Sequence, residues 1–174
     1  MRRLILVFIS FSLSFGISIK ELNNLSQQQF DTMLWVYKQG KQYNLGYTLM
    51  AIAWEESKFG KFKINLSDPS CGIFHNLLGS VANRLKLKPS NWNQSRICER
   101  LVQDNKFALN QAILELKLWD NYWRIRGYKN TWRRMVSSYN GGARGNKAYL
   151  QRIIKRIKIL RKYFKHLENN PTFK

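Results

Sequence analysis

The sequence predicts an all-α domain. Along most of the chain, apolar residues recur at the three- and four-residue spacing of a buried helix face, most clearly over 104–126. No stretch of useful length alternates polar and apolar residues as a half-buried strand does. With 174 residues, of which 44% are hydrophobic, the chain is long and apolar enough to form one domain with a core.

The first eighteen residues have the pattern of a secretory signal. Arg2 and Arg3 precede an apolar stretch over 4–15, which is too short to span a bilayer. Small residues allow cleavage after Gly16, with a second option near Ser18. We therefore predict a signal peptide over 1–18, one folded domain over 19–174, and a periplasmic or secreted location. An uncleaved membrane anchor or a buried first helix is the alternative.

The remaining chain divides into helices separated by turn-forming residues. Ser26 and Thr131 can cap helices, whereas Pro89 and Gly127 can end them. The segment 60–75 is rich in glycine, asparagine, serine and proline, which predicts an irregular loop. Helices are expected over 26–43, 47–57, 76–87, 95–103, 104–126, 131–140 and 144–165.

The most apolar of these helices ends in two adjacent carboxylates, Glu55 and Glu56. Six apolar residues, 49–54, precede them without a break, so the helix is expected to be buried. Glu56 shares a helix face with Leu49 and Ile52. Apolar surroundings disfavour the charged form of a carboxyl group, and a protonated carboxyl can act as a general acid. The alternative is that both glutamates are solvated groups at the end of a core helix.

Two later stretches combine glycines with polar and aromatic residues. Residues 71–75 read Cys-Gly-Ile-Phe-His within the predicted loop, and residues 138–142 read Ser-Tyr-Asn-Gly-Gly at a predicted helix end. Tyr139 can direct its hydroxyl at a carboxyl group while its ring packs inward. A plain glycine-rich helix end with a core tyrosine is the alternative.

In order along the chain, three motifs resemble those of the soluble lytic transglycosylases, relatives of goose-type lysozyme that cleave peptidoglycan. The family patterns Glu-Ser-x-Phe, Gly-Leu-Met-Gln and Ala-Tyr-Asn-x-Gly correspond here to 56–59, 72–75 and 138–142, and Tyr149-Leu150 follows as in the family. The resemblance covers residues 40–155 and implies a lysozyme-like helical domain with a substrate cleft. His75 departs from the pattern, because the family has glutamine there and histidine titrates near neutral pH.

The resemblance also implies roles for these residues and no cofactor. Glu56 would protonate the glycosidic oxygen between N-acetylmuramic acid and N-acetylglucosamine, and would then help to close a 1,6-anhydro ring. Tyr139 would donate a hydrogen bond to Glu56 and orient it, Asn140 would help to shape the cleft, and Ser57 would support the site. The residues expected to line the glycan groove are Gly72, Ile73, Phe74 and His75.

Carboxylates are scarce in the chain, which has only ten acidic residues. Apart from Glu55, no other acid adjoins Glu56 in a motif, and the next candidate, Asp68, precedes a proline as a turn residue does. Since glycosidases usually need two carboxylates, a single-acid route is favoured. Hydrolysis by water, as in lysozyme, remains open.

The two cysteines, Cys71 and Cys98, suit an oxidising compartment and can close one disulfide. Two unpaired buried thiols are the alternative. No metal site is predicted, because His75 and His166 are far apart in sequence and no Cys-x-x-Cys pair exists.

The formal net charge of +20 predicts attraction to a polyanion, which can be nucleic acid, an anionic membrane or an acidic cell wall. Nine basic residues and no acidic one lie between Arg144 and Lys165. Export argues against nucleic acid, so we predict a monomer that acts on peptidoglycan glycan strands, either for a secretion or conjugation apparatus or in wall turnover. A non-catalytic glycan-binding protein and an electrostatic nucleic-acid binder are the alternatives.

Overall fold

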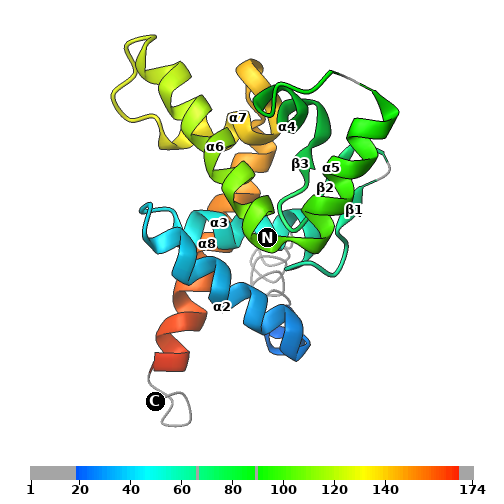
Figure 1. Cartoon of the computed structure of the whole chain (residues 1–174). Helices are drawn as coiled ribbons and strands as arrows, with labels where there is room; N and C mark the ends of the chain where they lie inside the picture. The colour runs from blue at the N-terminus through cyan, green and yellow to red at the C-terminus, as the bar shows by residue number, and fades with distance from the viewer. Residues whose placement is uncertain (1–18, 66, 89, 169–174) are drawn as a thin grey trace, which may run out of the picture.

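The computed structural model describes residues 19–65, 67–88 and 90–168, and the predicted signal segment 1–18 lies outside them. This part of the chain is mostly helical, as predicted (Figure 1). Residues 19–23 are helical, and the helices that follow are α2 (Gln27–Lys41), α3 (Gly46–Ser57), α4 (Leu78–Arg84), α5 (Asn91–Gln103), α6 (Asn105–Arg124), α7 (Trp132–Gly141) and α8 (Lys147–Glu168), with a 3-10 turn over Gly142–Arg144.

The chain also contains a small sheet that was not predicted, which lies partly in the segment 60–75 expected as an irregular loop and partly at the start of the helix expected over 76–87. Strands β1 (Ile64–Asn65), β2 (Ser70–Cys71) and β3 (Asn76–Leu77) pair antiparallel in that order. A strand of two residues is too short to show the alternation by which strands are recognised in a sequence. In Figure 1 the sheet lies beside α4 and α5, on the right of the molecule.

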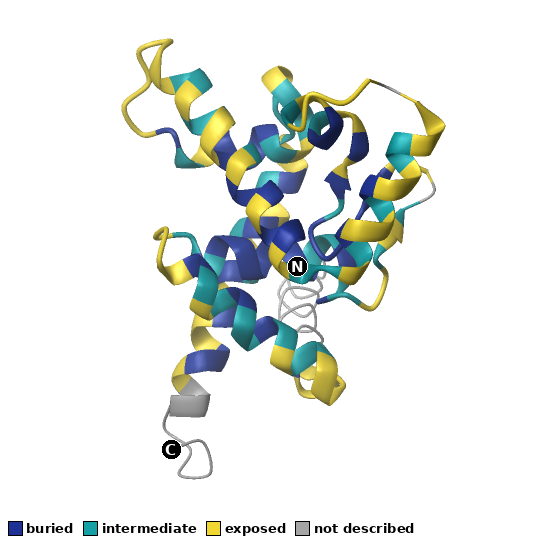
Figure 2. Ribbon diagram, viewed as in Figure 1, coloured by how far each residue is buried: buried dark blue, intermediate teal, exposed yellow. Residues whose placement is uncertain are grey.

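Helix α3 forms the centre of the core. Each residue from Leu49 to Trp54 is 0% exposed, as the unbroken apolar run predicts. Helix α3 packs against α2 and α8, while α6 packs against α7. Figure 2 shows α3 mostly in the colour of buried residues near the middle of the molecule. The glutamates at the end of α3 are therefore attached to the most rigidly enclosed helix of the fold.

Several helices begin where a side chain caps them. At the start of α2 the Ser26 hydroxyl accepts a hydrogen bond from the Gln29 backbone N–H, and the Gln29 side-chain oxygen accepts one from the Ser26 backbone N–H. Ser90 caps α5, which therefore begins four residues earlier than predicted. Asp104 caps α6 in the same way. Thr131, also predicted as a cap, makes no such bond.

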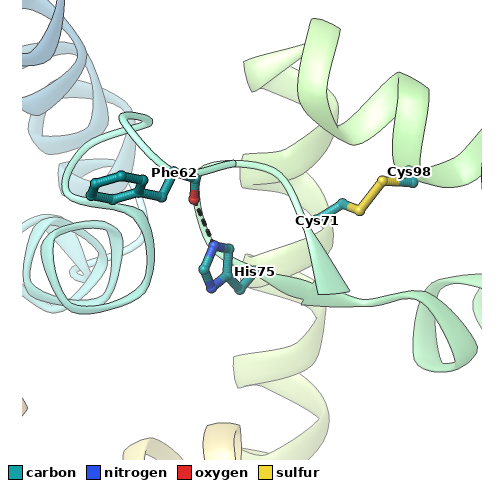
Figure 3. The surroundings of a disulfide bond; sticks show 4 residues. All are labelled: Phe62, Cys71, His75 and Cys98. Atoms are coloured by element: carbon teal, nitrogen blue, oxygen red, sulfur yellow. Dashed lines mark hydrogen bonds between the residues drawn. A yellow bond between two sulfur atoms is a disulfide. The ribbon is translucent and has the colours of Figure 1, made fainter. Parts of the chain in front are cut away.

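A disulfide joins the sheet to α5. Cys71 of β2 and Cys98 of α5 are bonded, with their Cα atoms 5.3 Å apart (Figure 3). The Asn76 side chain also donates to the Ala108 carbonyl of α6 at 3.1 Å. The disulfide and this hydrogen bond fix the segment around His75. No described helix is both long enough and apolar enough to cross a membrane.

Candidate active site

The two adjacent glutamates at the end of α3 face different surroundings. Successive helix residues are about 100° apart, so Glu55 and Glu56 cannot share a face. Glu55 accepts hydrogen bonds from Arg152 Nε at 2.5 Å and from Arg156 Nε at 2.6 Å. Burial favours the neutral form of Glu55, but the charges and hydrogen bonds of both arginines outweigh it and lower its pKa. Glu55 is therefore an ionised anchor between α3 and α8.

Glu56 instead lines a cavity of about 190 Å³. The side chain of Glu56 is 14% exposed. The wall brings together residues from α3, from the strand segment, and from α4, α6 and α7. The lining residues are Glu56, Asn65, Asp68, Ser70, His75, Asn76, Leu77, Ser80, Arg84, Glu115, Trp119, Ser138, Tyr139, Asn140 and Gly142. Of the residues predicted for the site, Glu56, His75, Tyr139 and Asn140 thus meet in one cavity.

Ser57 joins the first predicted motif to the second. Its side chain is completely buried, and its hydroxyl lies 2.7 Å from the Ile73 carbonyl, to which it donates. The same oxygen accepts from the Gly60 backbone at 2.8 Å. Ser57 thus supports the site through the backbone of the 72–75 segment, without lining the cavity.

Two side chains predicted to line the groove do not do so. Ile73 and Phe74 are both 0% exposed and belong to the core, because their apolar surface is removed from water there. Gly72 is buried as well, with a φ of +84°. A Cβ at Gly72 would lie 2.8 Å from the Leu101 carbonyl, so only glycine fits. This segment supplies backbone to the site, and His75 is its one side chain in the cavity wall.

His75 forms the closest charged contact of Glu56. The His75 Nδ1 lies 3.4 Å from Glu56 Oε2, while Nε2 lies 2.7 Å from the Phe62 carbonyl (Figure 3). A carbonyl only accepts, so Nε2 carries a hydrogen and Nδ1 of the neutral ring is bare. The contact with Glu56 is then attractive only when a proton lies between the two groups. Protonated His75 can therefore donate from Nδ1 to the Glu56 carboxylate.

The charge environment favours that proton. Burial of the imidazole opposes its charged form, but the contact with Glu56, the Phe62 carbonyl and the negative charge of Asp68 outweigh burial and raise the pKa of His75 above its usual value. Histidine in place of the family's glutamine thus adds a second proton-holding group beside the predicted acid.

The hydrogen bond predicted from Tyr139 to Glu56 is wrong. The Tyr139 hydroxyl donates to the Phe74 carbonyl at 2.9 Å, because the 72–75 segment brings that acceptor to the phenol. Burial, and then the negative charges of Glu56 and Glu115, raise the pKa of Tyr139 well above its usual value. Tyr139 therefore stays protonated and holds the backbone directly before His75.

Tyr149, at the start of α8, is a site residue that the sequence analysis did not assign. Its hydroxyl is buried and makes no well-aligned hydrogen bond to another described residue. Burial and the charge of Glu56 raise the pKa of Tyr149 well above its usual value. Tyr149 is therefore a second phenol close to Glu56, in addition to Tyr139. Its only signal in the sequence was its place after the third motif.

Glu115 of α6 was also missed. It lines the same cavity, forms an ion pair with Arg84, and accepts a hydrogen bond from Trp119 Nε1 at 2.8 Å. Arg84 also donates to Gln111 at 2.8 Å. Glu115 is thus a second carboxylate in the cavity wall, but one already engaged by donors.

We compared the chain with models of known families, with curated proteins and with solved structures. None of them matches.

The third motif closes the cavity beside Glu56. Asn140 is exposed, and its side-chain oxygen accepts from Asn146 at 2.7 Å. Within the described ranges, no cluster of three or more histidine, cysteine, aspartate or glutamate side chains could hold a metal ion. The arrangement offers one carboxyl group beside a histidine, a wall of hydrogen-bonding side chains, and an opening to solvent, which suits proton transfer to a bound polar ligand.

Proposed function

We propose that the chain is an exported lytic transglycosylase. It would cleave the β-1,4 bond between N-acetylmuramic acid and N-acetylglucosamine in peptidoglycan, using Glu56 as its only acid and base. The observation that carries the proposal is that Glu56, at the end of a buried helix, shares a cavity with His75, Tyr139 and Asn140 from the two later motifs. The lysozyme-like fold of the domain is part of the same proposal.

Cleavage begins with a proton on the Glu56 carboxyl group. Glu56 donates it to the glycosidic oxygen as the bond to the anomeric carbon breaks, and the acetamido group of the sugar supports the developing positive charge. The Glu56 carboxylate then takes the proton of the C6 hydroxyl, whose oxygen bonds to the anomeric carbon and closes the 1,6-anhydro ring. No water is consumed, and Glu56 regains its proton.

The other carboxylates of the cavity bear on the choice of route. A retaining glycosidase needs a second carboxylate free to attack the sugar, and an inverting one needs a carboxylate free to activate water. Glu115 is engaged by Arg84 and Trp119, which favours the single-acid route, whereas Asp68 is exposed and would be the carboxylate that activates water in the hydrolytic alternative. In this proposal, the donors around Glu115, which are Arg84 and Trp119, bind polar groups of the sugar.

The biological setting remains a prediction. Local opening of the wall for a secretion or conjugation apparatus, or wall turnover, suits an exported single domain. Periplasmic or secreted location and a monomeric state are proposed on the same basis.

Digestion of purified peptidoglycan tests the proposal. Wild type and Glu99→Gln should release fragments at equal rates, since Glu99 is an exposed carboxylate of α5 outside the cavity. Mass analysis should find muropeptides lighter by one water than hydrolytic products. Products with ordinary reducing ends would show that water cleaves the bond and that no anhydro ring forms. If wild type cleaves no glycan, the enzyme assignment is refuted.

A further inference from the structure

A second and larger cavity opens at the opposite ends of α3 and α7. Its volume is about 590 Å³, against about 190 Å³ at Glu56, and no residue lines both. Residues 46–48 of α3 and 132–133 of α7 line the second cavity, whereas Glu56 and 138–140 line the first. Eight helix residues separate Thr48 from Glu56, which is about 12 Å along the axis. The second cavity is therefore separate from the proposed active site.

The wall of this second cavity is strongly basic. Four cationic side chains and, among the described lining residues, no carboxylate face it: Lys41, Arg133, Lys158 and Arg161. Lys41, Arg133 and Lys158 form no ion pair with another residue in the described ranges. The Arg161 guanidinium lies 5.3 Å from the ring centroid of Tyr47. Like charges around one cavity repel, so a bound anion would relieve that repulsion.

The backbone adds to the positive potential. Helices α3 and α7 both begin at this cavity, and the residues before them, Leu45 and Thr131, give no side-chain cap. The helices that begin after Ser26, Ser90 and Asp104 are capped by those side chains. Uncapped N–H groups and the positive end of the helix dipole attract anions. The uncapped starts of α3 and α7 therefore add to the attraction that the four cationic side chains exert on an anion.

Apolar side chains form much of the remaining wall, together with Asn44, Gly46 and Thr48. Tyr37, Tyr47 and Trp132 contribute aromatic rings, and Ile154 and Ile157 contribute aliphatic surface. A volume of about 590 Å³ lies within the range of small-molecule sites. Four cationic side chains are better matched by a ligand with more than the single negative charge of a carboxylate. A phosphate monoester carries about two negative charges at neutral pH.

We propose that the cavity between α2, α3, α7 and α8 binds a small organic phosphate. The phosphate lies among Lys41, Arg133, Lys158 and Arg161, and the organic group lies on the aromatic and isoleucine surface. This site does not depend on the glycan-cleaving activity, since none of its residues lines the Glu56 cavity.

Calorimetric titration with phenyl phosphate at physiological ionic strength tests the proposal. The variant is Arg133→Gln with Lys158→Gln, and the matched control is Arg96→Gln with Lys106→Gln; all four side chains are exposed, so folding should be unaffected. Wild type and control should bind one equivalent, and the cavity variant should bind about tenfold or more weakly. Inorganic phosphate should bind more weakly than phenyl phosphate. No saturable binding, or equal weakening in both variants, would overturn the site.

Vesicles distinguish the two sources of such a phosphate. If phosphatidylcholine vesicles that contain phosphatidic acid bind the control better than the cavity variant, the ligand is a lipid headgroup. Equal binding of both variants, with phenyl phosphate binding still lost in the cavity variant, assigns a soluble ligand. Single-stranded DNA that displaces phenyl phosphate one-to-one, and that binds more tightly, would overturn the proposal in favour of nucleic acid.

Discussion

Replacing Glu55 by glutamine is expected to destabilise the protein by about 2 kcal/mol without abolishing cleavage. A hydrogen bond between charged groups contributes about 1.5–3 kcal/mol. Half of the Arg152 side chain is exposed, so solvent screens its contact with Glu55 to less than about 1 kcal/mol. The Arg156 side chain is only 18% exposed, so its bond accounts for most of the loss. The neutral amide of glutamine keeps part of that bond.

Urea unfolding measures the effect as a lower midpoint at an unchanged slope. The control Glu99→Gln, on an exposed face of α5, should stay within about 0.5 kcal/mol of wild type. The pKa of Glu55 lies below its usual value of 4.5 in the folded state, so its stabilisation is present above pH 4.5 and is lost as the pH falls through the lowered pKa. The difference between wild type and Glu55→Gln should therefore close in acid. Equal stability at pH 7, or a fully stable but inactive variant, would refute the assignment of Glu55 as an anchor.

Three further predictions follow from the segment 71–75. His75→Gln should keep activity but remove from the pH–rate profile the limb set by the raised pKa of His75, because glutamine does not titrate; an unchanged limb would contradict a role for His75 beside Glu56. Since the pKa of His75 is raised above 6.5, any stability that its charge provides is complete below pH 6.5 and is lost as the pH rises through the raised pKa. Gly72→Ala should cost about 2–4 kcal/mol in urea unfolding, because of its positive φ and the Leu101 carbonyl 2.8 Å away; a neutral substitution would show that the segment can shift. Cys71→Ser with Cys98→Ser should cost about 2–4 kcal/mol, since the bond closes a separation of 27 residues, and a reductant should lower the stability of wild type but not of the variant.

Helices were predictable where local signals are strong. The apolar run 49–54 and the cap at Ser26 both specify structure over a few residues, and both elements form as expected. The sheet of two-residue strands carries no such signal, because its pairing joins residues up to seven apart through a loop. The start of α5 was misplaced because the cap at Ser90 was overlooked.

The site was predictable as a set of segments but not as a set of contacts. Helical spacing could have found Glu115, which shares the face of Ala108, Ala112 and Trp119 in α6. The acceptor of the Tyr139 hydroxyl could not have been found, because a backbone carbonyl 65 residues away carries no side-chain signal. Motif positions alone also do not show which side chains of a segment face the core.

Motif order distinguishes the two adjacent glutamates. It selected Glu56 over its neighbour, and the structure gives the two glutamates different surroundings, an open cavity for one and two arginines for the other. The physical reason is the helix itself, which separates adjacent side chains by about 100°. The sequence predicts helix α3, and the packing of α8 against it determines that Glu55 is the glutamate paired with arginines.

The most direct measurement of the central claim is the rate at which Glu56→Gln releases fragments from purified peptidoglycan, compared with wild type and with Glu99→Gln at equal folded concentration. The amide has the shape of the acid but cannot donate the proton, so the account predicts a rate at least about 10²-fold below wild type, with Glu99→Gln unchanged. A Glu56→Gln variant that cleaves at the wild-type rate would contradict the account.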